Sequence, residues 1–550
     1  MAWVALVGPE EEENLSLRYL ASSLAAAGFD SKIVAFNASR ELSRVLSKIL
    51  SASDSPVVIG ISLAFQWRAK DFLALMVALR ERGFTGHITA GGHFGTFAYS
   101  ELLADFPEID SICRHEAERT IVSLTCAVAS GAPLQGIPGL AYRDSQGGTL
   151  VSPVPDPKDL SGLAWPDRRG EPEECLGHGM APIVGSRGCY ASCAFCCIAA
   201  WHALAPTGKR FRTRPVAEIA DEVAWLHKHR GIDIFTFHDD NFFLPDHRAS
   251  LERINGLADA LDARGVGRIG TVIKARPTDI TPEIVRALHD RLCCIRAYLG
   301  IETHTEQGLK TLTRRVRTND NNEAMRVMCE AGIYVCYNLL IFDPDTTVDD
   351  LAANLAFAEA HAEVPMNFGR VELYAGTPLL ARMQAEGRCT GDYLGWDYRL
   401  SSPMMHRIFK LAIQCFYPRN FAPDALALSL QGVRVQVEVC RQFHADLSEG
   451  AWLTEAKELS SRLTLDSVNG LREIMAFVQE DGAGHQRDFV RDLSRRLRKT
   501  EEEVREAAQT LETTLGQTVG ACCRPLRTME SSAASACPTA IPACETARGS

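Results

Sequence analysis

The sequence predicts an α/β protein with two parallel-sheet units followed by helices. Short apolar, β-branched runs alternate with helical segments from residue 2 to about 150, and again from about 181 to 380. Repeats of strand and helix build parallel sheets that are covered by helices. From residue 400 to 520 helical patterns replace the strand-like runs. We therefore expect an N-terminal Rossmann-like, doubly wound parallel sheet, then a partial (β/α)6 TIM-like barrel, and a mostly helical C-terminal region.

The first unit contains five runs that are typical of strands, at residues 3–7, 32–36, 57–62, 87–90 and 110–113. Ligands of doubly wound sheets bind at the carboxyl ends of the strands. Small residues stand at those ends here, namely Gly8, Ser62, Gly91 and Gly92. They allow the close backbone approach that a bulky flat ligand needs. A nucleotide-binding or purely structural Rossmann domain is the alternative for this unit, because the fold hosts many functions.

The second unit follows a proline-rich segment that we interpret as a linker, 151–180. Its predicted strands are 181–185, 232–237, 269–273, 295–301, 333–342 and 367–373. Six repeats fall short of the eight of a full barrel, so we expect an open barrel with its active face at the carboxyl ends. The predicted domains are 1–150, 181–380 and 381–523, and a Ser-, Ala-, Thr- and Pro-rich tail, 524–550, is expected to be disordered.

Composition excludes some partners and suggests a compartment. The 58 basic and 69 acidic residues give a net charge of −11, which argues against nucleic acid as a partner. No window approaches 18 consecutive apolar residues, so no membrane span is expected. The N-terminus lacks a basic leader and enters an acidic stretch, 10–13, which indicates a first strand rather than a secretory signal. A cytoplasmic protein keeps its cysteines reduced, and clustered thiols there are typically metal ligands.

Four of the eighteen cysteines lie within the ten residues GCYASCAFCC, 188–197. Cys189, Cys193 and Cys196 have the spacing C-x3-C-x2-C, whereas Cys197 directly follows its neighbour and points elsewhere. A tetrahedral zinc site would need a fourth ligand, and three ligands with one open position imply a metal that also binds something else. An iron–sulfur cluster fits this description. A disulfide-bonded or merely buried cysteine run is the alternative, and the reducing compartment disfavours it.

This cysteine loop follows the first predicted strand of the barrel, directly after GSRG, 185–188. The combination resembles the radical S-adenosylmethionine (SAM) superfamily, in which an aromatic residue, here Phe195, commonly precedes the last cysteine. The resemblance implies a [4Fe–4S] cluster on the three cysteines. It further implies that the fourth iron binds the amino and carboxylate groups of SAM, whose reductive cleavage yields a 5'-deoxyadenosyl radical. The cofactor carries this chemistry, and the protein orients it.

Further residues match the superfamily along the chain. HDDNF, 238–242, ends the second barrel strand, where the family contacts the methionine amino group, so Asp239 and Asp240 are candidates. GIET, 300–303, is similar to a segment whose glutamate binds the ribose hydroxyls, and Glu302 is the matching residue. A carboxylate suits a vicinal diol because it accepts two hydrogen bonds. Arg314 or Arg315 is expected to meet the methionine carboxylate, and the pattern does not distinguish them.

The first unit resembles the cobalamin-binding domain of one large radical SAM subclass. The match consists of GIS at 60–62, the glycine pair 91–92 and HEAE at 115–118, which includes Glu116. Other cobalamin proteins carry an axial histidine in a D-x-H-x-x-G motif after the first strand. The loop at 8–14 reads GPEEEEN and has no histidine, which implies cobalt without a protein imidazole below it. Gln66, Trp67 or Arg68 are then candidates for the position under the corrin, together with Gly8, Ser62, Gly91 and Gly92 as its cradle.

The resemblance implies an enzyme that uses SAM, a [4Fe–4S] cluster and cobalamin, most simply to methylate an unactivated carbon of a small molecule or peptide. An electron donor such as flavodoxin or ferredoxin is expected. A cobalamin-dependent radical cyclase or rearrangement enzyme is the alternative, and a cobalamin or iron–sulfur sensor module is the alternative without catalysis. Methylthiotransfer needs a second cluster, for which the first unit offers only Cys113 and Cys126. The sequence identifies no catalytic residue beyond these cofactor sites.

Overall fold

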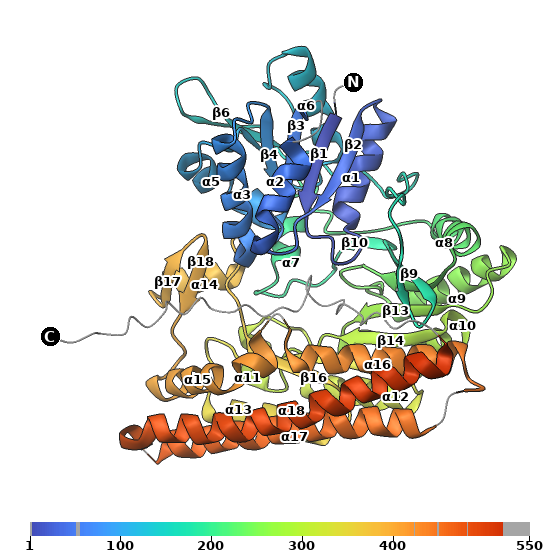
Figure 1. Cartoon of the computed structure of the whole chain (residues 1–550), viewed down its shortest axis with the longest axis vertical. Helices are drawn as coiled ribbons and strands as arrows, with labels where there is room; N and C mark the ends of the chain where they lie inside the picture. The colour runs from blue at the N-terminus through green and yellow to red at the C-terminus, as the bar shows by residue number, and fades with distance from the viewer. Residues whose placement is uncertain (1–2, 51–54, 423, 448–449, 481, 521–550) are drawn as a thin grey trace.

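A computed structural model describes residues 3–50, 55–422, 424–447, 450–480 and 482–520 (Figure 1). The predicted tail, 524–550, lies outside the described residues. The two predicted sheets are both present, one above the other in Figure 1, and the C-terminal helices lie below the second sheet. The predicted fold class is confirmed. None of the helices in the described part of the chain is both long and apolar enough to cross a membrane.

The first sheet has the strand order β2-β1-β3-β4-β5-β6-β7. The first five strands are parallel, as predicted, and β6 and β7 extend the sheet antiparallel. This hairpin was not predicted, because β7 is short and fully exposed and so lacks an apolar pattern. The strands are β1 (Trp3–Gly8), β2 (Asp30–Ala35), β3 (Val58–Ser62), β4 (His87–Gly91), β5 (Ser111–Cys113), β6 (Leu140–Arg143) and β7 (Thr149–Val151).

Helices cover both faces of this sheet. One apolar cluster joins the sheet to α1 and α6, and another joins its other face to α2, α3, α4 and α5. Both faces are therefore dry, which is why the central strands are apolar without alternation. The helices are α1 (Leu15–Ala26), α2 (Leu42–Leu50), α3 (Ala69–Glu81), α4 (His93–Phe97), α5 (Tyr99–Asp105) and α6 (Glu118–Ser130), with short 3-10 turns η1 (Ser39–Glu41) and η2 (Gln66–Arg68).

The second sheet has the order β16-β15-β14-β13-β12-β9-β8. Its six parallel strands are those of the predicted partial barrel, and β8 pairs antiparallel with β9 at the edge. The first barrel strand begins three residues earlier than predicted, at His178. The strands are β8 (Glu173–Cys175), β9 (His178–Ile183), β12 (Ile232–Phe237), β13 (Gly270–Ala275), β14 (Cys294–Leu299), β15 (Tyr334–Phe342) and β16 (Met366–Arg370).

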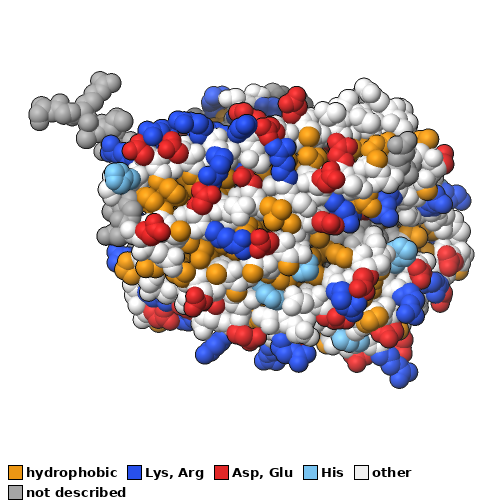
Figure 2. Space-filling model, turned by 90° about the horizontal axis from the view of Figure 1, so that it is seen from below, with side chains coloured by type: hydrophobic (Ala, Val, Ile, Leu, Met, Phe, Trp, Pro, Cys, Tyr) orange, Lys and Arg blue, Asp and Glu red, His pale blue; other side chains and the backbone are white. Residues whose placement is uncertain are grey.

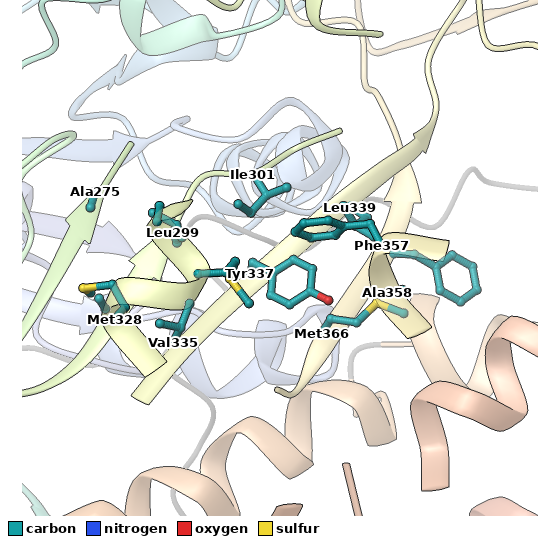
Figure 3. Packing of buried hydrophobic residues seen from close by; sticks show 14 of the residues in the cluster. Ala275, Leu299, Ile301, Met328, Val335, Tyr337, Leu339, Phe357, Ala358 and Met366 are labelled. Atoms are coloured by element: carbon teal, nitrogen blue, oxygen red, sulfur yellow. The ribbon is translucent and has the colours of Figure 1, made fainter. Parts of the chain in front are cut away.

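The outer face of the barrel packs on its own helices. Figure 3 shows part of this core, where Leu299, Val335 and Tyr337 of the strands meet Met328 of α12 and Phe357 of α13. The helices are α8 (Val216–Arg230), α9 (His247–Ala263), α10 (Pro282–Leu292), α11 (Glu306–Thr311), α12 (Thr318–Glu330), α13 (Val348–Ala360) and α14 (Pro378–Ala385), with η3 at Pro277–Asp279. Two hairpins, β10 (Ser186–Gly188) with β11 (Phe211–Thr213) and β17 (Cys389–Asp392) with β18 (Gly395–Tyr398), stand apart from the sheets.

The C-terminal helices close the inner face of the barrel. Successive strand residues point to opposite faces, and Ile234, Val272 and Tyr334 pack on α16, whereas their neighbours Phe235, Ile273 and Val335 pack on the outer helices. Fourteen of the eighteen residues of α16 are buried, because α17 and α18 cover its other side. The elements are α15 (Pro403–Phe416), a π-helical turn η4 (Tyr417–Phe421), α16 (Leu426–Phe443), α17 (Gly450–Gln479), η5 (Gly482–His485) and α18 (Gln486–Val519).

The face formed by these helices carries basic, acidic and hydrophobic side chains interspersed (Figure 2). Exposed ion pairs on α17 and α18 account for part of the charge, among them Arg472 with Glu359 at 2.6 Å and Arg496 with Glu473 at 2.7 Å. Exposed pairs of this kind contribute about 0–1 kcal/mol each to stability. They keep the helical surface hydrated rather than holding the fold together.

Candidate active site

The cysteine loop runs between β10 and α7 (Cys197–His202), at the carboxyl end of β9. Gly188 has a left-handed φ of 85°, and a Cβ there would overlap the carbonyl oxygen of Arg210. Only glycine therefore allows the turn into Cys189. Farther along the loop, the Ala194 N–H donates to Leu312 O and the Ala194 carbonyl accepts from Leu379 N–H, both at 2.9 Å. Backbone bonds thus fix the loop on the strand ends of the barrel.

Two buried arginines converge on Cys193, whose side chain is 7% exposed. Arg276 Nη1 lies 3.4 Å from Cys193 Sγ, and Arg314 Nη1 lies 3.9 Å from it. Arg314 also donates to the Gly300 carbonyl, whereas Arg315 is exposed. Two positive charges therefore lie beside a candidate cluster ligand. Of the two arginines that the sequence left open, Arg314 is the one directed at the cysteine loop.

Glu302 lies just beyond β14, close to Arg314. Its Oε1 is 3.6 Å from Arg314 Nη1, and burial raises the pKa of its carboxyl although the arginine opposes this. Its backbone has φ 63° and its carbonyl accepts from Leu340 N–H at 2.6 Å. A left-handed glutamate costs about 1–3 kcal/mol, and such strain concentrates at functional sites. The side chain is thereby held at the strand-end edge with its charge facing the cysteine loop.

Asp239 and Asp240, beyond β12, both support the cysteine loop. Asp239 Oδ1 accepts from Gly185 N–H at 2.6 Å, and burial raises the pKa of Asp239 to about 6. Asp240 Oδ2 accepts from Gly188 N–H at 2.9 Å and lies 3.7 Å from His202 Nε2. These carboxylates therefore hold the entry to the loop. Phe195, by contrast, is half-buried and packs on the barrel core.

The strand ends of the first sheet approach one another closely at their glycines. Gly92 has φ 97°, and a Cβ there would stand 2.9 Å from the backbone of Leu63 and Ala64. A Cβ on Gly8 would be 3.0 Å from Ser62 Cβ, and one on Gly91 would be 3.2 Å from the Cys113 carbonyl oxygen. Side chains are thus excluded where three loops meet. The backbone itself therefore forms this edge.

The loop after β3 faces the barrel. The Gln66 amide lies 3.5 Å from Leu373 O and 3.4 Å from Ala375 N, both beyond β16. Arg68 turns inward and donates to Phe36 O at 3.1 Å. Trp67 is half-buried between them. Gln66 therefore tethers the two units, which leaves Trp67 as the side chain of this loop that is best placed to contact a ligand.

Glu116 and the acidic loop also join the units. Glu116 pairs with Arg212 of β11 and lies 3.2 Å from Arg187 of β10. These contacts commit Glu116 to the interface between the two units.

In the loop after β1, Glu13 pairs with Arg168, and Glu12 lies 3.2 Å from His238 Nε2. The loop that lacks an axial histidine thus forms ion pairs and hydrogen bonds with the barrel and the segment leading to it.

Comparison with known proteins gives the same assignment for both units. A B12-binding domain model matches residues 3–125, and a radical SAM superfamily model matches residues 183–358. The chain belongs to the cobalamin-binding radical SAM enzymes. It is therefore an enzyme, so the sensor alternative is set aside, and its cofactors are a [4Fe–4S] cluster, SAM and cobalamin.

Two curated relatives and one solved structure illustrate the family. The chain is 25% identical to an uncharacterised methyltransferase, PH0819, of Pyrococcus horikoshii over 350 residues, 63% of this chain and 72% of that protein. It is 27% identical to an anaerobic magnesium-protoporphyrin IX monomethyl ester cyclase of Synechocystis, over 47% of this chain and only half of the cyclase. The cobalamin-dependent SAM radical enzyme OxsB with aqua-cobalamin bound has the same fold, with a TM-score of 0.64, 17% identity and coverage of 96% of this chain and 83% of that one.

The cysteines of this radical SAM enzyme fit an iron–sulfur cluster better than a single metal ion. Burial raises the pKa of Cys189 to about 11, raises that of Cys196 still further, and raises that of Cys197 to about 12. These thiols are protonated at neutral pH until a metal displaces the proton. In the described residues no three or more His, Cys, Asp or Glu side chains converge on a point that suits one metal ion. A cubane needs no such convergence, because each cysteine binds a different iron.

The sequence analysis did not predict some of the residues in this enzyme's site. Arg276, one residue beyond β13, contacts Cys193, and Tyr190 donates to Asp279 nearby. Trp201, on α7, packs against the cobalamin-binding domain. A signal existed for Arg276, since it directly follows a predicted strand at the active edge of the sheet. None existed for Trp201, because its partners come from the other domain.

Proposed function

We propose that this enzyme is a cobalamin-dependent radical methyltransferase that methylates an unactivated carbon of a small molecule or peptide. The observation that carries the proposal is the position of the cysteine loop, whose helix α7 contacts the strand-end loops of the cobalamin-binding domain. A substrate held between the two edges would be within reach of both cofactors. Proximity of this kind matters because a carbon radical must react before it is quenched.

Each candidate residue then has a distinct task. When bound, the cluster and SAM supply a hydrogen-abstracting 5'-deoxyadenosyl radical, and the corrinoid supplies the methyl group. Cys189, Cys193 and Cys196 hold the cluster, while Arg276 and Arg314 place positive charge beside Cys193. Glu302 offers a carboxylate to the ribose diol, and Arg314 offers a guanidinium to the methionine carboxylate.

The cobalamin side of the proposal depends on shape more than on charge. Gly8, Ser62, Gly91 and Gly92 leave a backbone edge against which a corrin can lie. The half-buried Trp67, in the loop after β3, is our candidate for a side-chain contact to the corrin. The acidic loop has no imidazole to offer, and its Glu12 and Glu13 contact His238 and Arg168. A corrinoid bound at this edge would therefore receive no histidine from the loop after β1.

A test of methyl transfer does not require the natural substrate. Anaerobically reconstituted protein is incubated with hydroxocobalamin, a low-potential reductant and SAM whose methyl group carries deuterium. A methyltransferase is expected to give S-adenosylhomocysteine and a deuteromethylated corrinoid, both measured by mass spectrometry, besides 5'-deoxyadenosine. The Cys193→Ala variant should lose 5'-deoxyadenosine formation and keep methylation of the corrinoid. Formation of 5'-deoxyadenosine with no S-adenosylhomocysteine would contradict the proposal.

A radical cyclase or rearrangement enzyme is the second candidate, favoured by the similarity to the Synechocystis cyclase over 47% of this chain. The same assay separates the two, because ring formation consumes no methyl group. A turnover that yields 5'-deoxyadenosine, unlabelled product and no S-adenosylhomocysteine would assign the cyclase.

The remaining expectations concern the cellular setting. None of the fourteen cysteines in the described part of the chain forms a disulfide, which supports our proposal of a reducing cytosol. We propose flavodoxin or ferredoxin as the electron donor, since the cluster must be reduced before SAM is cleaved. Replacing the chemical reductant with reduced flavodoxin in the assay should sustain 5'-deoxyadenosine formation.

A further inference from the structure

Helix α7 is positioned to transmit contacts to the cluster. It spans only Cys197–His202, and Cys196, the third candidate ligand, is its N-cap residue. A displacement of α7 therefore moves Cys196 directly. Two consecutive side chains at the end of the helix, Trp201 and His202, are both buried.

Trp201 contacts the cobalamin-binding domain through three side chains. It is 8% exposed, and its ring stacks on that of His115 with centroids 4.0 Å apart and an interplanar angle of 18°. A second ring, His93, meets it edge-on at 5.0 Å. The indole N–H donates to Thr96 Oγ1 at 3.2 Å, and the same oxygen accepts from the His115 backbone N–H at 2.9 Å. One hydroxyl thus joins α7 to the loops after β4 and β5.

His115 is held in an unfavourable conformation by these contacts. Its φ is 66°, its side chain is 3% exposed, and neither ring nitrogen has a hydrogen-bond partner in the described structure. Burial lowers the pKa of His115 to about 4, so the ring that stacks on Trp201 is neutral. A strained backbone persists only where its surroundings over-determine it. Here those surroundings include a residue of the other domain.

His202 connects α7 to the opposite side of the cysteine loop. Its Nε2 lies 3.7 Å from Asp240 Oδ2, which accepts from Gly188 N–H at 2.9 Å. Gly188 directly precedes Cys189. Both ends of the cysteine loop are therefore linked to α7.

We infer that Trp201 is a positioning residue that fixes the cysteine loop against the cobalamin-binding domain through His115 and Thr96. The cluster site and the corrinoid site are thereby held at one separation. This inference rests on the two domains belonging to one enzyme and not on methyl transfer, so it stands whether the reaction is methylation or cyclisation. The Trp201 side chain contacts His93, His115 and Thr96 of the other domain, so it acts through the position of α7.

Amide hydrogen exchange on the cluster-reconstituted full chain tests the inference. The informative variant is His115→Gly, because glycine adopts φ 66° without strain, so the stack is removed without adding a backbone penalty. The change is made in the cobalamin-binding domain, and exchange is measured in the peptide covering residues 189–202. We expect exchange there to accelerate about 5- to 10-fold, the combined effect of losing an aromatic stack and weakening a neutral hydrogen bond.

Matched variants separate positioning from packing. Thr96→Val keeps the volume and removes the shared acceptor, so it should give a smaller acceleration in the same peptide, while Trp201→Phe should retain part of the stack. Trp225→Leu, at an exposed tryptophan (36%) on α8, should leave that peptide unchanged. Unchanged exchange at 189–202 in His115→Gly and Thr96→Val would overturn the inference. If His115→Gly fails to fold, exchange at 189–202 in Thr96→Val alone tests the inference.

A spectroscopic readout reports the separation itself. With the cluster reduced and the cobalt in its paramagnetic divalent state, magnetic dipolar coupling between the two centres depends steeply on their distance. Trp201→Leu should weaken and broaden this coupling at unchanged iron and corrinoid content, and Trp225→Leu should not. An unchanged coupling in Trp201→Leu would contradict the inference, whereas loss of methyl transfer with intact coupling would concern only the proposed function.

Discussion

The carboxyl ends of the barrel strands and those of the cobalamin-binding domain differ in the kind of groups that they present. The barrel edge gathers charged groups beside Cys193, because Arg276 and Arg314 lie within 4 Å of its thiol and Glu302 lies within 4 Å of Arg314. The edge of the cobalamin-binding domain is built from glycine backbone, and its acidic loop contacts the barrel and the segment before it. A compact anionic cluster needs cations placed beside it, whereas a large flat corrin needs an uncluttered surface. Substitutions should therefore act on the first edge through charge and on the second through shape.

The largest effect is expected where the barrel edge holds its metal. Cys193→Ala should reduce 5'-deoxyadenosine formation by more than about 100-fold, since even an outer-shell partner of a metal ligand is worth 10- to 100-fold. Iron content and the visible spectrum measure the loss. Cys197→Ala, at the adjacent cysteine outside the C-x3-C-x2-C pattern, is the control and should retain the cluster. Equal loss in both variants would show that the loop merely misfolds.

The charge of the barrel edge is tested by two adjacent arginines. Arg314→Gln removes the guanidinium beside Cys193 and Glu302, and we expect 5'-deoxyadenosine formation to fall about 10- to 100-fold. Arg315→Gln changes an exposed neighbour and should stay within about twofold, as surface substitutions usually do. Steady-state rates at saturating SAM provide the measurement. Similar rates in the two variants would show that Arg314 does not contribute to the active site.

Glu302 is expected to give the edge a pH dependence. Burial raises the pKa of Glu302, so its carboxylate is protonated, and loses its charge, at a higher pH than that of an exposed glutamate. SAM affinity should therefore weaken as pH falls through this raised pKa. Glu302→Gln should bind SAM about tenfold more weakly at neutral pH, the worth of a charge-assisted hydrogen bond, and show no such weakening on acidification. Calorimetric titration measures the affinity for SAM at each pH. A wild-type affinity that does not change with pH would contradict the role of the carboxylate in binding SAM.

The shape of the other edge is tested at two glycines that both have a positive φ. Gly92→Ala and Gly83→Ala place alanine at φ 97° and 84°, where an L residue is strained. At Gly83 no atom lies within 4 Å of the added Cβ, whereas at Gly92 the Leu63 and Ala64 backbone is 2.9 Å away. Gly92→Ala should lose about 1 kcal/mol more stability and bind hydroxocobalamin more weakly. Denaturant unfolding and spectral titration measure both, and equal values in the two variants would show that the close approach is unimportant.

The sequence was most informative where one segment carries the whole signal. The eleven parallel strands followed from apolar, β-branched runs, and the cysteine loop followed from its spacing. Strands of three residues such as β7 and β10 are too short to form a pattern. The choice between Arg314 and Arg315 required the fold, because adjacent residues in a turn point in different directions. Trp201 and His115 are 86 residues apart and meet only across the domain interface.

The acidic loop after β1 shows a further limit. The sequence predicted only what GPEEEEN lacks, an axial histidine, and the structure shows what its carboxylates contact. Glu13 pairs with Arg168, which also pairs with Glu222 at 2.8 Å, and Glu222 lies 2.7 Å from Arg214. Such a network could not be anticipated, because its four members lie in three separate segments and each looks like a surface charge by itself.

That network restricts how the family's domains can be recombined. A chimera that imports a histidine-bearing loop from another cobalamin protein would delete Glu13 and leave one buried positive charge in excess near Arg168. Stranding one partner of a buried ion pair costs about 3–5 kcal/mol, a large share of the stability of a typical domain. Grafts into this scaffold will need to carry Glu13 and Arg168 together, so the unit of exchange extends beyond the first domain's own boundary.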